Sequence, residues 1–122
     1  MTSPARSETI ERHARPWGWY ETLSEVPGHK IKRIHINAGQ QLSLQKHQQR
    51  AEHWVVVQGL AHVTVGEQVL DLDTGAHVDI AVGQVHRLAN RSAAPVEIIE
   101  VQFGRYLGED DIVRLSDDYH RS

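Results

Sequence analysis

The strongest structural signal in this chain is GQQLSLQKHQQRAEHWVVVQG, residues 39–59, where two strand-like patterns adjoin. In its first half, Leu42 and Leu44 alternate with polar residues, which is typical of a strand with one buried face. The second half, from Glu52 onward, is rich in valine and ends at a glycine, as strands often do. The four residues between His47 and Glu52 are enough to turn the chain, and if the two strands pair as a hairpin, Gln45, His47 and Glu52 can converge at one end of the core.

The same kind of pattern extends in both directions along the chain. Alternating or β-branched segments are separated by turn signals at intervals of roughly 8–12 residues, and hardly any helical periodicity lies between them. This predicts an all-β sandwich or barrel. The expected strands cover residues 15–23, 30–36, 41–47, 52–59, 60–65, 68–73 and 94–103, with at least two more within 74–92.

Both ends of the chain lack this pattern. Residues 1–14 are polar, and we expect a flexible N-terminal arm with a short helical turn at 7–13. A single domain is expected over 15–122. Its acidic tail, 108–122, is expected to form one helical turn or a solvated arm.

An aromatic segment, RPWGWYETL at 15–23, opens the predicted domain. Its proline and glycine exclude the interior of a helix. Strand alternation predicts that Trp17, Trp19 and Glu21 share one face, with Tyr20 on the other. We therefore expect an aromatic strand that closes one side of the core.

Length and composition restrict the function. A chain of 122 residues is expected to form one domain. It has no cysteine, which excludes disulfides, thiolate metal sites, iron–sulfur clusters and a cysteine nucleophile. A net charge of −3 gives no basic excess for nucleic-acid binding, and the apolar runs are too short to span a membrane. No secretory signal is recognisable, so we expect a cytoplasmic protein.

The nine histidines are the main chemical feature, because without cysteine a transition-metal site must use imidazole, carboxylate or amide groups. Gln45 and His47 are two residues apart on a predicted strand and point to the same face. Glu52 opens the next strand, and His86 begins a later one. Any one of these histidines alone is more often a surface or core residue. The four side chains together suit zinc, manganese, iron, cobalt or nickel.

The spacing within residues 39–59 resembles the first motif of the cupin family, with glutamine in place of its first histidine, and residues 75–90 resemble the second motif. The likeness narrows to the type II mannose-6-phosphate isomerase cupin, which commonly forms the C-terminal part of bifunctional enzymes with mannose-1-phosphate guanylyltransferase. It rests on six blocks in order: RPWGWYETL, KIKRI, LSLQKH, RAEHWVVVQG, HRLAN and GRYLGEDDIVR. This resemblance implies an all-β cupin double-stranded β-helix, or jelly-roll barrel.

The resemblance also implies a ligand set. In the related type I isomerases a Gln-x-His pair, a glutamate and a later histidine bind zinc, and the block LSLQKH is similar to theirs. By that likeness Gln45, His47, Glu52 and His86 would hold a divalent metal ion, most often zinc. The spacing alone singled out the same four residues. Gln49 stands where the family often has a further histidine.

The activity implied by the resemblance is the interconversion of mannose 6-phosphate and fructose 6-phosphate, in which a proton moves between C1 and C2 of the open-chain sugar. Two alternatives stay open: a non-catalytic sugar-binding cupin, and another metal-dependent cupin enzyme such as a dioxygenase. No glycine-rich phosphate loop occurs in these 122 residues, which excludes nucleotidyl transfer by them.

Four further residues are candidates for catalysis or substrate binding. Lys32 shares a face with two isoleucines and is either a base, a phosphate partner or a strand-end lysine that reaches water. Arg50 lies between two ligand-bearing segments and suits a phosphate group or an ion pair with a nearby glutamate. Arg87 follows His86 and should point the opposite way. His53 is a candidate proton carrier but faces away from Glu52 unless the strand is bulged there.

The remaining features are expected to be structural. The acidic run 109–111 is expected to be solvated or to face a second subunit, because fold analogy suggests a homodimer that exchanges the strand at 15–23. The three tryptophans are expected to pack rather than to stack on sugar. The histidines for which we expect no chemistry are His13, His29, His35, His62, His77 and His120.

Overall fold

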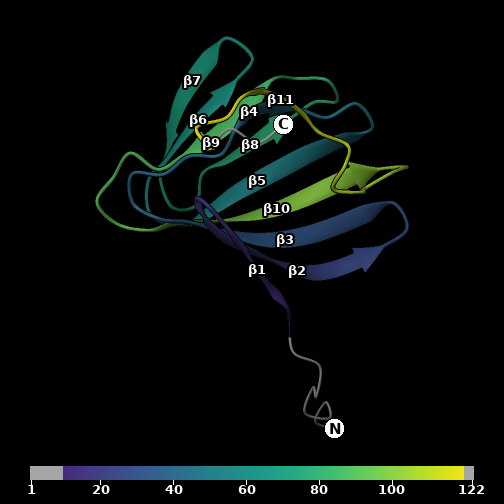
Figure 1. Cartoon of the computed structure of the whole chain (residues 1–122), viewed down its shortest axis with the longest axis horizontal. Helices are drawn as coiled ribbons and strands as arrows, with labels where there is room; N and C mark the ends of the chain where they lie inside the picture. The colour runs from purple at the N-terminus through teal and green to yellow at the C-terminus, as the bar shows by residue number, and fades with distance from the viewer. Residues whose placement is uncertain (1–9, 120–122) are drawn as a thin grey trace, which may run out of the picture.

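The computed structural model describes residues 10–119, and within that range it contains strands and turns but no helix. Eleven strands form two antiparallel sheets, and Figure 1 shows the smaller sheet above the larger one. The larger sheet has the order β1-β2-β3-β10-β5-β8, and the smaller has the order β11-β4-β9-β6-β7. The prediction of an all-β chain is confirmed.

The strands are short, between three and nine residues long. In chain order they are β1 (Arg12–Arg15), β2 (Gly18–Val26), β3 (His29–Ile36), β4 (Leu44–Lys46), β5 (Arg50–Gln58), β6 (Ala61–Val65), β7 (Gln68–Leu72), β8 (His77–Ile80), β9 (His86–Ala89), β10 (Val96–Gly104) and β11 (Val113–Ser116). The two segments of residues 39–59 form β4 and β5, but these strands lie in different sheets and do not pair with each other. The two strands therefore do not form a hairpin, although the chain does turn between the two segments.

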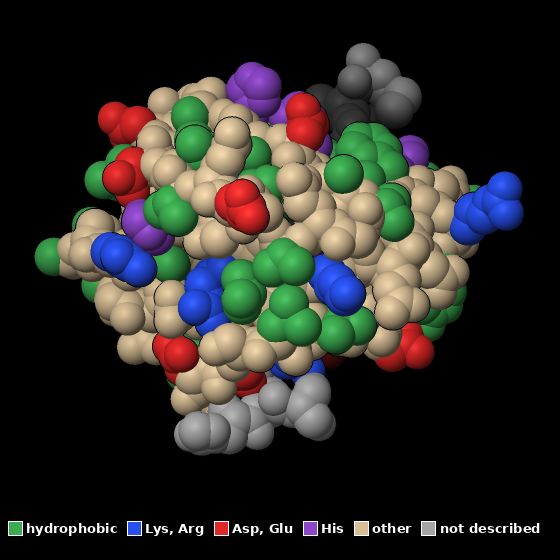
Figure 2. Space-filling model, turned by 90° about the horizontal axis from the view of Figure 1, so that it is seen from above, with side chains coloured by type: hydrophobic (Ala, Val, Ile, Leu, Met, Phe, Trp, Pro, Cys, Tyr) green, Lys and Arg blue, Asp and Glu red, His purple; other side chains and the backbone are tan. Residues whose placement is uncertain are grey.

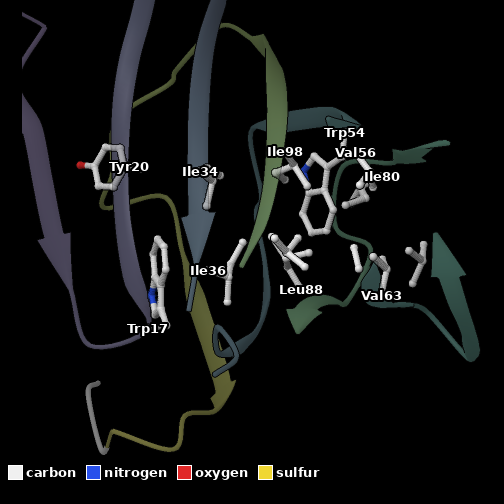
Figure 3. Packing of buried hydrophobic residues seen from close by; sticks show 13 residues of the cluster. Trp17, Tyr20, Ile34, Ile36, Trp54, Val56, Val63, Ile80, Leu88 and Ile98 are labelled. Carbon is white, nitrogen blue, oxygen red and sulfur yellow. The ribbon is translucent and has the colours of Figure 1, made fainter. Parts of the chain in front are cut away.

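The apolar core lies between the two sheets (Figure 3). It includes Trp54 and Val56 from β5, Ile98 from β10, and Val63 and Leu88 from the smaller sheet, each at most 3% exposed. Burying a side chain of this size contributes about 1.5–3 kcal/mol, so this cluster holds the sheets together.

The inner face of the larger sheet is apolar at one end and polar at the other. Toward the same end, the buried residues change from isoleucine to lysine in β3, and from isoleucine to glutamate and glutamine in β10. In β5 they change from valine and tryptophan to glutamate and arginine. The register aligns these changes, because Glu100 pairs with both Lys32 and Trp54. We call the following six buried residues the polar end: Lys30, Lys32, Arg50, Glu52, Glu100 and Gln102.

The two ends of the chain differ from expectation. Residues 12–14, expected in a flexible arm, form β1 together with Arg15 and pair with β2. His13, expected in a helical turn, lies in this strand and stacks on Tyr20. Residues 1–9 of the expected arm lie outside the described residues. Near the other end, β11 extends the smaller sheet where we expected a helical turn or a solvated arm. Both are edge strands held by backbone pairing, which needs no apolar pattern in the sequence.

The aromatic segment is only partly as predicted. Tyr20 is buried, and Trp19 and Glu21 lie on the opposite side of β2, where Trp19 stacks on His35 at a centroid distance of 4.8 Å. Trp17, however, joins the core and does not share a face with Trp19. The reason is that β2 begins only at Gly18, so strand alternation does not extend to Trp17.

The outer surface is not uniformly polar. Seen from above in Figure 2, hydrophobic side chains gather near the middle of the face, with Lys or Arg side chains on both sides. On the smaller sheet, Val69 and Leu115 are more than half exposed. Residues 10–119 contain no helix long and apolar enough to cross a membrane.

Candidate metal centre

Three of the four predicted metal ligands meet inside the barrel. The nearest ligand atoms of His47, Glu52 and His86 all lie within 4.8 Å of one another. His47 Nε2 is 3.1 Å from Glu52 Oε2, and His86 Nε2 is 3.9 Å from Glu52 Oε1. Each of the three residues is at most 3% exposed. A compact group of two imidazoles and a carboxylate is a donor set that zinc and related divalent ions accept.

The strands explain why these side chains converge. Glu52 belongs to the inner face of β5, which alternates as predicted. His86 is the first residue of β9, and its backbone pairs with Gln45 of β4. His47 directly follows β4. Gln45, the fourth predicted ligand, is buried, and its backbone position opposite His86 places it beside this group.

Backbone carbonyl groups orient both imidazoles. The Nδ1 atom of His47 donates to the carbonyl oxygen of Asp111, and Nδ1 of His86 donates to that of Gln84 at 2.9 Å. Since a carbonyl only accepts, the proton of each ring is on Nδ1, and each Nε2 points toward Glu52. This arrangement fixes a histidine for metal binding in many metalloproteins.

The Nε2 atom of His86 is the observation that best supports metal binding. It is buried, and the described residues provide it with no hydrogen-bond partner. Burial also lowers the pKa of His86, which keeps the ring neutral and its lone pair available. A buried nitrogen without a partner costs free energy, which a bound cation would recover. The residues present therefore fit a divalent metal ion.

The charge of Glu52 is stabilised by its neighbours. Burial alone would raise its pKa, but its contacts with the side chains of Glu100 and His47 and the charge of Arg50 hold the pKa well below its ordinary value. Glu100 shows the opposite effect, because burial and the adjacent Glu52 raise its pKa well above the ordinary value. The pKa values of the two adjacent carboxyl groups thus shift in opposite directions, which favours the negative charge on Glu52 over Glu100. Trp54 Nε1 donates to both, at 2.8 Å to Glu52 and 3.2 Å to Glu100.

Arg50 lies closer to the metal centre than predicted. It is the first residue of β5 and is 7% exposed, rather than part of an open loop. Its Nε donates to Glu52 Oε2 at 2.8 Å, and its Nη2 donates to His47 Nε2 at 3.2 Å. Arg50 thus pairs with Glu52, one of the two glutamates considered for it, but the pair is buried rather than on the surface.

A cavity of about 140 Å³ opens beside this centre. Gln45, His47, Arg50 and Glu100 contribute to its wall, and Lys32 reaches it from β3. Lys32 is 5% exposed, which confirms that it shares the inner face with the isoleucines of β3. The cavity therefore connects the metal ligands with basic side chains.

Two predicted site residues are placed elsewhere. His53 lies on the opposite side of β5 from Glu52 and contacts His77 at 3.1 Å and Asp79 at 2.9 Å. The strand is not bulged at this point, so His53 does not reach the cavity. Arg87 donates to the carbonyl oxygens of Leu42, at 3.1 Å, and Ser116, at 3.0 Å. It ties chain segments together and is not among the residues that line the cavity, which agrees with the expectation that it points the opposite way from His86.

Sequence reasoning missed several residues around the site. Glu100, Asp111 and Lys30 were not among the predicted site residues, and Asp111 was placed in a solvated run. Asp111 instead binds His47 and accepts hydrogen bonds from the backbone of Gln48 and Gln49 at 2.9 Å. For Glu100 a signal was present, because it continues the apolar face of β10 at the same end where β3 and β5 become charged.

Comparison with known proteins agrees with this geometry. Residues 5–117 match the family model described as "Mannose-6-phosphate isomerase C-terminal". The chain is 51% identical to the xanthan biosynthesis protein XanB of Xanthomonas campestris, over all of this chain and 27% of that protein. It is 46% identical to the alginate biosynthesis protein AlgA of Pseudomonas aeruginosa, over all of this chain and 26% of that protein. The chain thus spans about a quarter of the length of the curated relatives it matches.

The fold is also found in solved structures. A Klebsiella pneumoniae protein with a double-stranded β-helix domain superposes with a TM-score of 0.69 at 21% identity, over 92% of this chain and 88% of that one. This likeness confirms the predicted double-stranded β-helix. The chain therefore belongs to the mannose-6-phosphate isomerase C-terminal family, with a cupin fold and a histidine–glutamate–histidine group that can hold a metal ion.

Proposed function

We propose that this chain is a metal-dependent aldose–ketose isomerase that interconverts mannose 6-phosphate and fructose 6-phosphate. The family supports the substrate, and the cavity supports the chemistry, since it joins a candidate metal centre to basic side chains that suit a phosphate group. The observation that carries the proposal is the buried group of His47, Glu52 and His86, of which His47 lines that cavity.

We propose that His47, Glu52, His86 and Gln45 hold the metal ion and that this ion is zinc, although manganese, cobalt, nickel and iron suit the same donors. When bound, a divalent ion supplies Lewis acidity beside the two carbons that exchange a proton. The protein's own contribution is orientation. The carbonyl groups that bind Nδ1 of both histidines keep their Nε2 atoms directed at the centre.

The basic residues of the cavity are assigned to the phosphate rather than to proton transfer. The ammonium of Lys32 is already paired with Glu109 at 2.6 Å and lies 4.2 Å from the centre of the Tyr20 ring. A lysine side chain in such a contact is suited to binding an anion. Glu100 lines the same cavity, and burial and the adjacent Glu52 raise its pKa well above the ordinary value, so we assign it the donation of a proton to a sugar oxygen.

The test is conversion of mannose 6-phosphate to fructose 6-phosphate by the purified chain loaded in turn with zinc, manganese, cobalt and nickel. We expect conversion with at least one metal and a loss of at least about 100-fold in His47→Ala and Glu52→Ala. His62→Ala is the matched control, because His62 binds Asp71 on the outer side of the smaller sheet and its loss should leave the rate unchanged.

Each other outcome selects a different function. Absence of conversion with every metal would contradict the isomerase. Binding of mannose 6-phosphate without conversion would indicate a non-catalytic sugar-binding cupin. Metal-dependent oxygen uptake without isomerisation would indicate a dioxygenase. Undiminished rates in both Ala variants would contradict the metal centre itself.

A further inference from the structure

Two lysines of β3 point into the barrel beside each other. Lys30 and Lys32 are each 5% exposed, and they occupy successive inner positions of the strand. Placing two like charges side by side in a buried position is costly unless an anion neutralises them. The ammonium groups of Lys30 and Lys32 therefore require an anion close to them.

One carboxylate from outside the sheets neutralises most of this charge. Glu109 Oε1 is 2.6 Å from Lys32 Nζ, and Glu109 Oε2 is 3.4 Å from Lys30 Nζ. Lys30 also donates to the carbonyl oxygen of Leu107 at 2.7 Å, and the largely exposed Glu25 lies 3.7 Å from it. Burial would raise the pKa of Glu109, but Lys32 and then Lys30 lower it, so the carboxylate is charged at neutral pH.

Glu109 differs from its partners in exposure. Its side chain is half exposed, at 50%, whereas the side chains of both lysines are 6% exposed. It is carried by the segment between β10 and β11, which has no strand or helix of its own. A carboxylate on such a segment can leave the lysines without disturbing either sheet, whereas the lysines cannot leave β3.

The cavity beside this carboxylate carries a positive excess. The charged residues of its wall are Arg15, Lys32, Arg50, Arg114, Glu100 and Glu109. These are four basic side chains against two carboxyl groups, so the wall carries a positive excess even with both carboxyl groups charged. An anion that enters the cavity therefore meets a field that favours it.

We propose that Lys30 and Lys32 form an oxyanion subsite and that Glu109 fills it as a built-in competitor, which the phosphate group of the substrate replaces. The choice of phosphate rests on the proposed function, whereas the subsite rests on the two lysines and Glu109. A phosphate monoester carries a charge of about −1.5 to −2 at neutral pH and so matches two ammonium groups better than one carboxylate does.

The same segment is anchored at the metal centre. Asp111, two residues after Glu109, binds His47 Nδ1 through its carbonyl oxygen and the backbone of Gln48 and Gln49 through its carboxylate. Replacement of Glu109 by phosphate therefore involves only the part of the segment that precedes Asp111. Departure of Glu109 leaves the contact that orients His47 in place.

Titration calorimetry with inorganic phosphate at pH 7.5 tests this subsite. In Glu109→Gln the competitor loses its charge while its shape is kept, and we expect the Kd for phosphate to fall at least about tenfold. Asp110→Asn is the matched control, because the adjacent Asp110 binds Tyr106 and not the lysines. It should leave the Kd unchanged. Lys32→Met in the Glu109→Gln background should remove phosphate binding.

A second measurement covers the case in which Glu109→Gln folds poorly because its lysines lack a partner. Phosphate should then cause a larger rise in Tm for this variant than for the unaltered chain. Chloride at equal ionic strength should cause no such difference between the two proteins. Equal phosphate affinity or an equal Tm shift in the two proteins would overturn the subsite, even if the chain isomerises mannose 6-phosphate. Tighter phosphate binding supports it, even if no isomerisation is found.

Discussion

At the scale of single residues, spacing was enough to select the candidate metal ligands but not the residues that support them. Gln45, His47, Glu52 and His86 could be chosen because strand alternation determines which side chains share a face. Their supporting contacts come from far along the chain. Asp111, for example, reaches His47 across 64 residues, and no local pattern encodes that distance.

The indole of Trp54 provides a test at this scale. Its Nε1–H binds the two carboxyl groups of the polar end, so Trp54→Phe keeps most of the apolar volume but leaves Glu52 and Glu100 one donor short. We expect a loss of about 1–3 kcal/mol in the free energy of unfolding, measured by urea denaturation. Trp19→Phe, on the outer side of β2, should change it by less than about 1 kcal/mol, and equal losses would contradict this account.

At the scale of strands, the alternating segments were predictable and the edge strands were not. β3 and β5 follow their sequence patterns closely, because one face of each is buried along most of its length. β1 and β11 contain no buried residue, so burial leaves no pattern in their sequences. β1 pairs with the free backbone edge of β2, and β11 pairs with the free backbone edge of β4.

An ion pair across β3 and β10 predicts how stability depends on pH. Burial alone would raise the pKa of Glu97, but hydrogen bonds from Arg33 and His35 lower it below its ordinary value of 4.5. The charged form is thus favoured in the folded state. Its contribution is complete above pH 4.5 and is lost as the pH falls through the lower, folded-state value. Glu97→Gln should reduce Tm at pH 7 and flatten the Tm–pH curve below pH 4.5; an unchanged curve would contradict this.

The turn after β5 can be tested through its glycine. Gly59 has a φ of +84°, and a Cβ atom there would lie 2.5 Å from the carbonyl oxygen of Pro95. Gly59→Ala should therefore lower the free energy of unfolding by well over about 1 kcal/mol. Gly39→Ala is the matched control, because Gly39 has a φ of +75° but open space around it. Urea denaturation of both should show the smaller loss for Gly39→Ala.

At the scale of the whole molecule, the candidate metal centre joins the two sheets. Glu52 comes from the larger sheet, whereas His86 and the β4 segment belong to the smaller one. The fold class was predictable from the spacing of turns, but which strands enter which sheet was not, since β4 and β5 adjoin in sequence and separate in space. The homodimer stays a prediction, which light scattering after gel filtration would check.

Because the ligands come from both sheets, metal binding should stabilise the whole barrel. At a free zinc concentration 100 times the Kd, the free energy of unfolding should rise by about 2.7 kcal/mol. Calorimetric scans with zinc and after chelation would show this as a higher Tm with the metal. In His86→Ala the two scans should coincide. A zinc-induced shift of the same size in that variant would place the metal elsewhere.

The division of the barrel interior into an apolar and a polar end has a consequence for evolution and engineering. Buried charged and polar groups such as Glu100 and Gln102 are often less stabilising than apolar residues of the same size. Selection for heat resistance alone would therefore tend to replace the polar end first, and the resulting barrel would be more robust and chemically inert. Persistence of charge at this end under such selection would be a sign that the chain is still being selected for its chemistry.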